Sequence, residues 1–170
     1  MSGMSLTPLT KLPLPLPGRI FGSPMPFGDY DPEGEALLKF KEEKISLIVL
    51  LAEEEECLRK TGRNLKALYI KEGFQVIHIP IPDFNVPSKE DLDQAVKITV
   101  EQARAGCHVA IHCDAGIAQT GLFAASLAKE VLGLSGEEVI RWARKYIPGA
   151  VETREQRQLI MGDDTSRKPH

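Results

Sequence analysis

The sequence predicts a single-domain α/β sandwich in which a central, mostly parallel sheet of four to five strands is flanked by helices. Short β-rich runs alternate with helical patterns along the middle of the chain, and only helical patterns follow the last run. The length of 170 residues suits one domain. Hydrophobic residues make up 42% and charged residues 26%, close to the globular average, so a disordered, collagenous or repeat-built chain is not expected.

Four β-rich runs predict the strands of this sheet. They lie at residues 19–22, 45–51, 75–79 and 108–112. The second and fourth runs are almost entirely apolar, which is typical of strands that helices bury on both faces.

Helical patterns occupy the stretches between and after these runs. They lie at residues 33–43, within 53–72, and at 89–105, 120–132, 135–146 and 153–161. The clearest one, 89–105, has a single apolar stripe made of Leu92, Ala95, Val96, Thr99, Val100 and Ala103. Ser88 with Asp91 predicts an N-cap for this helix. Ser135 with Glu138 predicts a capping box for the helix at 135–146.

The two ends of the chain differ from the domain between them. Residues 1–18 form a proline-rich N-terminal arm, residues 19–162 the domain, and residues 163–170 a polar tail. Seven of the 12 prolines fall within the first 32 residues, several alternating with leucine. Such a run favours extended polyproline geometry, so we expect an arm that lies on the domain or a flexible lead.

Charge and cysteine content exclude several classes of protein. The net charge of −3 gives no overall attraction to nucleic acid or to anionic lipid. No apolar stretch approaches the roughly 20 residues of a membrane span. The three cysteines are odd in number and no signal peptide precedes them, so a secreted disulfide framework is not expected. We therefore expect a cytoplasmic protein with free thiols and with neither nucleic acid nor membrane as a partner.

Residues 109–121 run from a buried strand through a loop of small residues into a helix. Backbone N–H groups in such a loop converge on one point, and the helix N-terminus adds its positive dipole end, so the segment predicts an anion site. The residues expected to hold the anion are Asp114, Ala115, Gly116, Ile117, Ala118 and Gln119. Cys113 begins the loop, where the same field stabilises the nucleophilic thiolate. The plain alternative is a structural cysteine in an ordinary strand-to-helix turn.

This segment resembles the signature of the cysteine-dependent protein tyrosine and dual-specificity phosphatases, His-Cys, five residues, Arg, then Ser or Thr. The matching residues are His112, Cys113, Ala115, Gly116, Thr120 and Gly121. Residues 79–87 resemble the loop that carries the general acid of that family, and Asp83 lies 30 residues before Cys113. Residues 147–153, followed by Gln156 and Gln158, resemble the segment that closes the site. The resemblance implies the phosphatase-type sandwich.

The resemblance also implies a role for each matching residue. Cys113 attacks phosphorus, and Asp83 protonates the leaving group and then serves as general base. The Thr120 hydroxyl stabilises the departing thiolate, while Gln156 or Gln158 positions water. His112 tunes the thiol. Three of these have structural alternatives: Asp83 as a turn residue, Thr120 as a helix cap and His112 as a core histidine.

The position of the signature arginine is where this sequence departs from the family. Gln119 stands there and carries no charge. Hydrogen bonds with a charged partner contribute about 1.5–3 kcal/mol and neutral ones about 0.5–1.5 kcal/mol, so the loss corresponds to on the order of 10²–10⁴ in rate. Three explanations stay open: a weak natural phosphatase helped by Arg154 or Arg157, a pseudophosphatase that binds without turnover, or a glutamine introduced into an active enzyme.

The resemblance implies hydrolysis of phosphotyrosine, phosphoserine or phosphothreonine through a cysteinyl-phosphate, impaired by Gln119. The alternative is a catalytically weak or dead pseudophosphatase that binds phosphorylated ligands. Expected ligands are a phosphorylated protein or a small phosphomonoester, and phosphate or sulfate suits the same site. A highly phosphorylated lipid headgroup is not expected, because its additional negative charges would lie beside the Asp114 carboxylate rather than beside basic residues. No cofactor and no metal are expected, because the cysteines and histidines lack the spacing of a closed metal site.

Overall fold

The sheet has five strands in the order β1-β2-β5-β3-β4, in a computed structural model that describes residues 9–82 and 85–166. The strands are β1 (Thr10–Leu12), β2 (Ile20–Ser23), β3 (Ile45–Leu50), β4 (Gln75–His78) and β5 (His108–His112). Neighbouring strands are parallel except β1 and β2, which are antiparallel. The predicted fold class, a mostly parallel sheet between helices, is confirmed.

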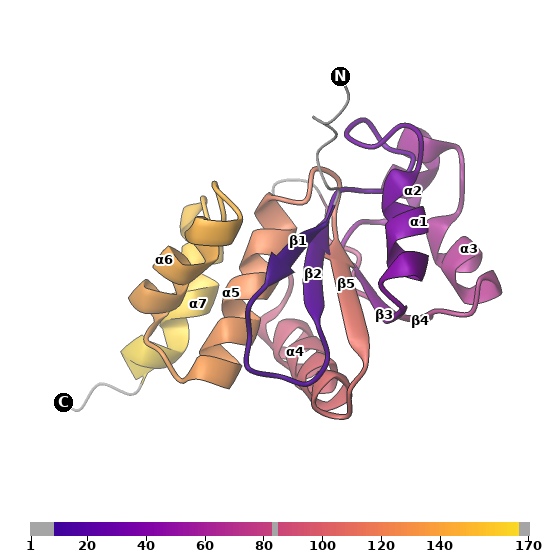
Figure 1. The fold of residues 1–170 in the computed structure, drawn as a ribbon. Coiled ribbons are helices and arrows are strands. Elements are labelled where there is room, and N and C mark those ends of the chain that lie inside the picture. The colour runs from indigo at the N-terminus through magenta and orange to yellow at the C-terminus, as the bar shows by residue number, and fades with distance from the viewer. Residues whose placement is uncertain (1–8, 83–84, 167–170) are drawn as a thin grey trace, which may run out of the picture.

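Seven helices are present among the described residues (Figure 1). They are α1 (Glu35–Glu42), α2 (Glu54–Thr61), α3 (Leu65–Lys71), α4 (Lys89–Arg104), α5 (Ala118–Leu132), α6 (Gly136–Tyr146) and α7 (Arg154–Ser166). The predicted caps are present: Ser88 Oγ accepts the Asp91 amide hydrogen over 3.1 Å, and Ser135 and Glu138 form a capping box. Helix α7 continues past residue 162 into the residues expected to form a polar tail.

Strand β1 lies in the segment expected to be a proline-rich arm, and the sequence did not predict it. It pairs with β2 at the edge of the sheet, and Leu12 is buried in the core. After it, the Leu14 amide donates to the Leu12 carbonyl over 2.9 Å and the Leu16 amide to the Leu14 carbonyl over 2.8 Å. These local bonds supply partners for the amides that alternate with prolines.

Two hydrophobic cores fill the space between the sheet and the helices, because successive side chains of a strand point to opposite faces. On β3, Leu47 and Val49 join the core shared with α4–α7, whereas Ile48 and Leu50 join the core shared with α1–α3. The helices lie on the two faces accordingly (Figure 1). Leu50 pairs with His112, so β3 and β5 end at the same edge, where ligands bind in open parallel sheets.

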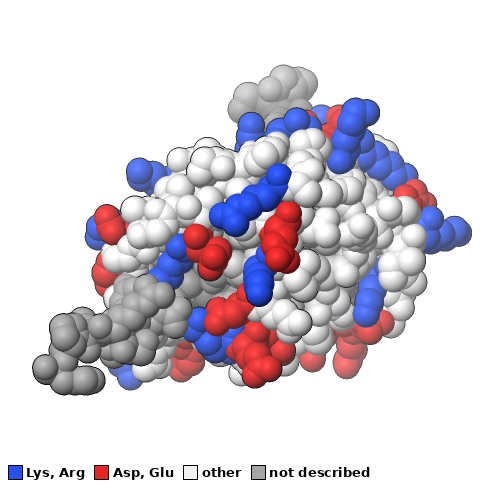
Figure 2. Space-filling model, turned by 90° about the horizontal axis from the view of Figure 1, so that it is seen from below, with Lys and Arg blue, Asp and Glu red and all other residues white. Residues whose placement is uncertain are grey.

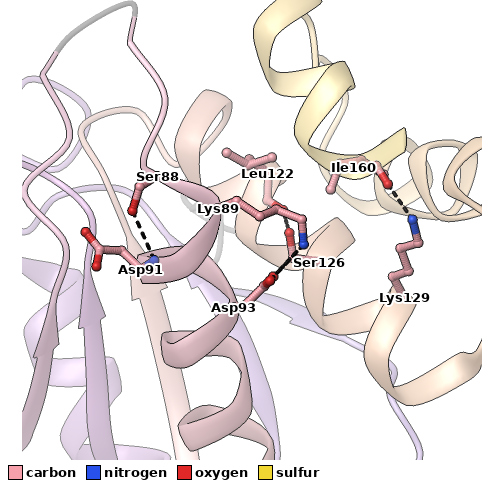
Figure 3. A network of polar contacts seen from close by, with 8 residues as sticks. All are labelled: Ser88, Lys89, Asp91, Asp93, Leu122, Ser126, Lys129 and Ile160. Atoms are coloured by element: carbon pink, nitrogen blue, oxygen red, sulfur yellow. Dashed lines mark hydrogen bonds and ion pairs between the residues drawn. The ribbon is translucent and has the colours of Figure 1, made fainter. Parts of the chain in front are cut away.

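Helix α7 is tied to the rest of the domain by polar contacts with α5 (Figure 3). The Lys129 ammonium of α5 donates to the carbonyl oxygen of Ile160 in α7. Nearby, Lys89 pairs with Asp93 over 2.8 Å at the start of α4. The bond from Lys129 joins α5 to the helix that carries Gln156, whereas the Lys89–Asp93 pair lies within α4.

The molecular face seen from below in Figure 1 carries acidic and basic side chains that are interspersed (Figure 2). This distribution agrees with the small net charge of −3. Within residues 9–82 and 85–166, none of the helices has the length and apolar character needed to cross a membrane.

Candidate active site

The loop between β5 and α5, residues 113–117, has amide groups with no backbone partner. Outside the regular elements, no amide of residues 114–120 donates to a described backbone carbonyl, and Gly121 makes the first helical bond, to Ile117, over 2.7 Å. Gly116 has φ 82°, and a Cβ there would lie 2.7 Å from the Ser23 carbonyl oxygen. Glycine therefore allows the loop to rest on β2 in a left-handed conformation. The result is a row of amides available to an anion at the start of a helix.

Cys113 is buried and lines a pocket of about 280 Å³. The Thr120 hydroxyl donates a hydrogen bond to the Cys113 sulfur over 3.2 Å. Cys57 and Cys107 do not line this pocket. Burial raises the pKa of Cys57 to about 12, so that side chain stays a neutral thiol at neutral pH. Cys113 is thus the one cysteine among the described residues that a ligand in this pocket would meet.

His112 lies behind the loop with both ring nitrogens bonded. Its Nδ1 is 2.9 Å from the Cys113 carbonyl oxygen, and its Nε2 is 2.7 Å from the Tyr69 hydroxyl. Complete burial lowers the pKa of His112 to about 4, so the ring is neutral near pH 7. Because a carbonyl only accepts, Nδ1 carries the hydrogen, and Tyr69 donates to Nε2. This chain of hydrogen bonds fixes the Cys113 carbonyl from the core side.

The Asp114 carboxylate forms an ion pair with Lys60. Its Oδ2 is 2.7 Å from the Lys60 ammonium of α2, which also lies 3.5 Å from Asp29. The hydrogen bond to Asp114 raises the pKa of Lys60. The negative charge expected beside the loop is therefore partly compensated. The loop is also held at Asp114 by its carbonyl, which accepts the Met25 amide hydrogen over 2.8 Å.

Gln119 is buried, and its side chain is turned towards the segment expected to carry the general acid. Its Nε2 donates to the Asn85 carbonyl oxygen over 2.8 Å, while its Oε1 has no hydrogen-bond partner among the described residues. Asp83 lies outside the described residues. Ile81 and Asn85, on either side of it, line the Cys113 pocket.

Of the two glutamines considered for positioning water, Gln156 lines the pocket and Gln158 does not. Gln156 is buried, and its Oε1 accepts the amide hydrogens of Glu152 over 3.0 Å and Thr153 over 3.3 Å. Gln158 is exposed and borders another hollow, with Val86 and Glu155. Two residues on a helix are turned by about 200°, so both glutamines cannot face one pocket.

The only charged side chains among the described residues that line the pocket are carboxylates, and no described lysine or arginine lines it. Its described lining residues are Leu51, Glu56, Ile81, Asn85, Cys113, Asp114, Ala115, Ile117, Ala118, Gln119, Gly149, Glu152, Thr153 and Gln156. Arg157, a candidate for a relocated arginine, pairs instead with Glu137 of α6. Arg154, the other candidate, is exposed and is not among the lining residues.

Two further features of the described residues bear on ligands. A hollow of about 410 Å³ lies between α4, α5 and α7, where Lys97 and Leu159 are among its lining residues, and it does not include Cys113. Within the same described ranges, no group of three His, Cys, Asp or Glu side chains could hold a metal ion.

Sequence reasoning missed three residues of the site. Tyr69, Lys60 and Asn85 contact His112, Asp114 and Gln119 across 43, 54 and 34 residues of chain, respectively. Their contacts depend on how α2, α3 and the 79–87 segment pack around the sheet. A buried tyrosine hydroxyl needs a partner, but the sequence does not say which one.

Residues 27–130 match the model of the Tc-R-P family, described as "Polymorphic toxin system, DSP-PTPase phosphatase". The chain belongs to this family. The match includes the loop with Cys113 and most of α5. The chain is a small dual-specificity phosphatase-like protein, which confirms the resemblance seen in residues 112–121.

Individual proteins agree with this family. The tyrosine-protein phosphatase cdc-14 of Caenorhabditis elegans is 32% identical over 122 residues, covering 71% of this chain and 16% of that protein. The chain thus spans only a small part of this curated relative. The crystal structure of Tk-PTP in the active form is 29% identical with a TM-score of 0.76, covering 96% of this chain and all of that one.

A crystal structure of kinase associated phosphatase, with its catalytic site cysteine replaced by serine, has a TM-score of 0.79. It covers 97% of this chain and all of that one, at 21% identity. This second structure supports the fold alone.

Proposed function

We propose that this protein hydrolyses phosphomonoesters on tyrosine, serine or threonine through a cysteinyl-phosphate, with a rate lowered by Gln119. The observation that carries the proposal is the 3.2 Å hydrogen bond from Thr120 to the Cys113 sulfur, below a row of amides without backbone partners. The thiolate form of Cys113 accepts such a bond, and the amides suit the oxygens of a phosphoryl group.

In the first step, the Cys113 thiolate attacks phosphorus in line with the leaving oxygen. The S–P bond forms as the P–O bond breaks, and the leaving alkoxide or phenoxide takes a proton from Asp83. The pocket-lining positions of Ile81 and Asn85 support this role for Asp83. The amides of residues 114–119 hold the phosphoryl oxygens.

In the second step, water attacks phosphorus and the P–S bond breaks. The Asp83 carboxylate accepts the proton of that water, and the Cys113 sulfur leaves as a thiolate that the Thr120 hydroxyl stabilises. The Gln156 amide positions the water. Its oxygen already accepts two backbone amides at the start of α7, so its NH₂ group is the end available to water.

Gln119 lowers the rate because its donor group is committed elsewhere and carries no charge. The NH₂ group bonds to the Asn85 carbonyl rather than to the ligand. The amides still bind the phosphoryl group, but no side-chain charge follows the charge that develops in the transition state. The same observation favours a second candidate, a pseudophosphatase that binds a phosphorylated ligand without turnover.

A phosphoenzyme experiment tests the proposal. The protein is mixed with a phosphotyrosine peptide, quenched in acid and digested, and the peptide containing Cys113 is examined by mass spectrometry for a phosphoryl adduct. We expect the adduct on Cys113. Asp83→Asn should slow its formation, because the tyrosine oxygen must then leave without a proton. Cys107→Ser is the matched control, since Cys107 lies outside the pocket.

Loss of the adduct in Cys113→Ser and its persistence in Cys107→Ser would support the catalytic proposal. If no adduct forms and no phosphate is released, while the peptide still binds in competition with inorganic phosphate, the pseudophosphatase is the correct alternative. If neither chemistry nor phosphate-competitive binding occurs, both functions are excluded.

A further inference from the structure

Gln119 presents a hydrogen-bond acceptor at the position where the family has a cation. Its Nε2 faces the Asn85 carbonyl over 2.8 Å, and a carbonyl only accepts, so the orientation of the amide is fixed. The other end, Oε1, is buried without a partner among the described residues, in a side chain that is only 8% exposed and lines the pocket. A ligand group that donates a hydrogen bond would satisfy this oxygen.

The charges around the pocket also favour a ligand with little negative charge. Glu56 and Glu152 line the pocket, together with Asp114, whose charge Lys60 partly compensates. A second negative charge on a ligand would be repelled by these carboxylates, and no described lining residue offers a cation in return.

We propose that the pocket selects the monoanionic form of a phosphomonoester, whose P–OH group donates a hydrogen bond to Gln119 Oε1. This inference rests on the proposed function and adds the protonation state that the site recognises. The remaining phosphoryl oxygens accept from the loop amides, so every polar group of the ligand and of Gln119 is paired. In the dianion the donor is lost, and an oxygen lone pair faces Oε1 instead.

The test must separate titration of the ligand from titration of the protein. Among the described residues, the ionisable groups that line the pocket are Cys113 and Asp114 of the loop, Glu56 of α2 and Glu152 before α7. Asp83, outside the described residues, is a further ionisable group because the proposed function makes it the general acid. Lys60 acts through Asp114, and His112 lies behind the loop. The ligand-free protein is the same in both titrations, so a difference between two ligands in the pH at which affinity changes must come from the ligands.

Two non-hydrolysable peptides of the same sequence provide the probes, one with a methylenephosphonate and one with a difluoromethylenephosphonate in place of phosphotyrosine. Fluorine withdraws electrons and lowers the second pKa of the phosphonate, so the two ligands lose their P–OH at different pH. Dissociation constants are measured by calorimetry from about pH 5 to about pH 8, a range that brackets the second ionisation of a phosphomonoester. The native protein is compared with Gln119→Arg and with Gln119→Met, which is of similar size but has neither amide group.

For the native protein, affinity should fall about tenfold per pH unit above the second pKa of each ligand, so the two curves separate by the difference between the ligands. In Gln119→Arg, affinity should instead rise as each ligand ionises, because the guanidinium binds the dianion. In Gln119→Met, affinity should fall less steeply with pH, because no side-chain oxygen accepts from the P–OH group.

Two curves that fall at the same pH would assign the effect to a protein group and overturn the inference, as would equal affinity for both ionisation states. In those cases the proposed function stands, because phosphonates still bind. If neither phosphonate binds at any pH, the proposed function and this inference fail together.

Discussion

Cys113 and Gln119, on either side of the loop between β5 and α5, differ in how completely their polar groups are paired. At the Cys113 end, the sulfur accepts from Thr120 and the carbonyl accepts from His112, which Tyr69 holds in turn. At the other end, Gln119 bonds to another segment and leaves an oxygen without a described partner. Cys113 is therefore held by contacts that do not involve the residue at the arginine position. Replacing Gln119 should change the chemistry while leaving the position of Cys113 unchanged.

The largest expected effect comes from placing a positive charge at position 119. Gln119→Arg should raise kcat/KM for an aryl phosphate by on the order of 10² or more, because a bidentate cation follows the charge on the phosphoryl oxygens. Steady-state assays of phosphate release measure kcat/KM for both proteins. Gln94→Arg adds the same charge on the exposed side of α4 and should change nothing. A change below about threefold for Gln119→Arg would contradict the comparison, since the Cys113 end would then not be ready for catalysis.

The buried side chain of His112 predicts how the stability of the protein depends on pH. The pKa of His112 is about 4 in the fold, against 6.5 for an ordinary histidine. As pH falls from 6.5 to 4, the unfolded chain binds a proton that the folded protein refuses, so the free energy of unfolding decreases. The loss amounts to about 3 kcal/mol and is absent above that window. Urea unfolding across this range measures it. His112→Asn should flatten the dependence and His78→Asn should retain it; an unchanged slope in His112→Asn would assign it elsewhere.

Removing the Tyr69 hydroxyl tests the hydrogen bond that holds His112. Tyr69→Phe should lower the free energy of unfolding by about 1–3 kcal/mol, because it leaves Nε2 of His112 buried without a partner. Urea unfolding measures the cost. Tyr30→Phe, at a side chain that is 64% exposed, should cost far less. Equal costs would mean that the Tyr69–His112 bond contributes nothing specific.

The smallest expected effect concerns Asp114, between the two ends. Asp114→Asn removes one carboxylate from the pocket and leaves Lys60 paired with Asp29 alone, so inorganic phosphate should bind several-fold more tightly at low salt. The gain should shrink as salt is added. Competition against a fluorescent phosphopeptide measures it, and Asp93→Asn, outside the pocket, is the control. Weaker phosphate binding in Asp114→Asn would show that the carboxylate shapes the loop more than it repels the anion.

The sequence predicted the parts of the fold that depend on local pattern. Strand β5 was predicted with its observed bounds, and the caps at Ser88 and Ser135 follow from side chains three residues from their partners. Strand β1 was missed, because three residues before a proline run give almost no periodicity. Residues 53–72 form two helices, and the signals of the break were present: Gly62 is left-handed at φ 72°, and Asn64 caps α3.

The site could be predicted only as far as its residues are neighbours in sequence. The Cys113–Thr120 contact lies within one strand-loop-helix segment, so its family pattern located it. The orientation of the Gln119 amide group could not be predicted, because it depends on a carbonyl 34 residues earlier. His112 is indeed a satisfied core histidine, the structural alternative considered for it, and it also contacts Cys113 through the carbonyl. The tuning role for His112, like the other catalytic roles, stays a prediction.

The contact between β2 and the loop determines which stretch of chain can work by itself. Residues 27–130, which match the family model, exclude the Ser23 carbonyl against which Gly116 lies, and the Met25 amide that holds Asp114. They also exclude α7, with Gln156 in the pocket wall. A fragment trimmed to the matched residues would lose two contacts that support the loop and part of the wall of its own pocket. The smallest autonomous unit of this protein therefore extends at least from β2 into α7.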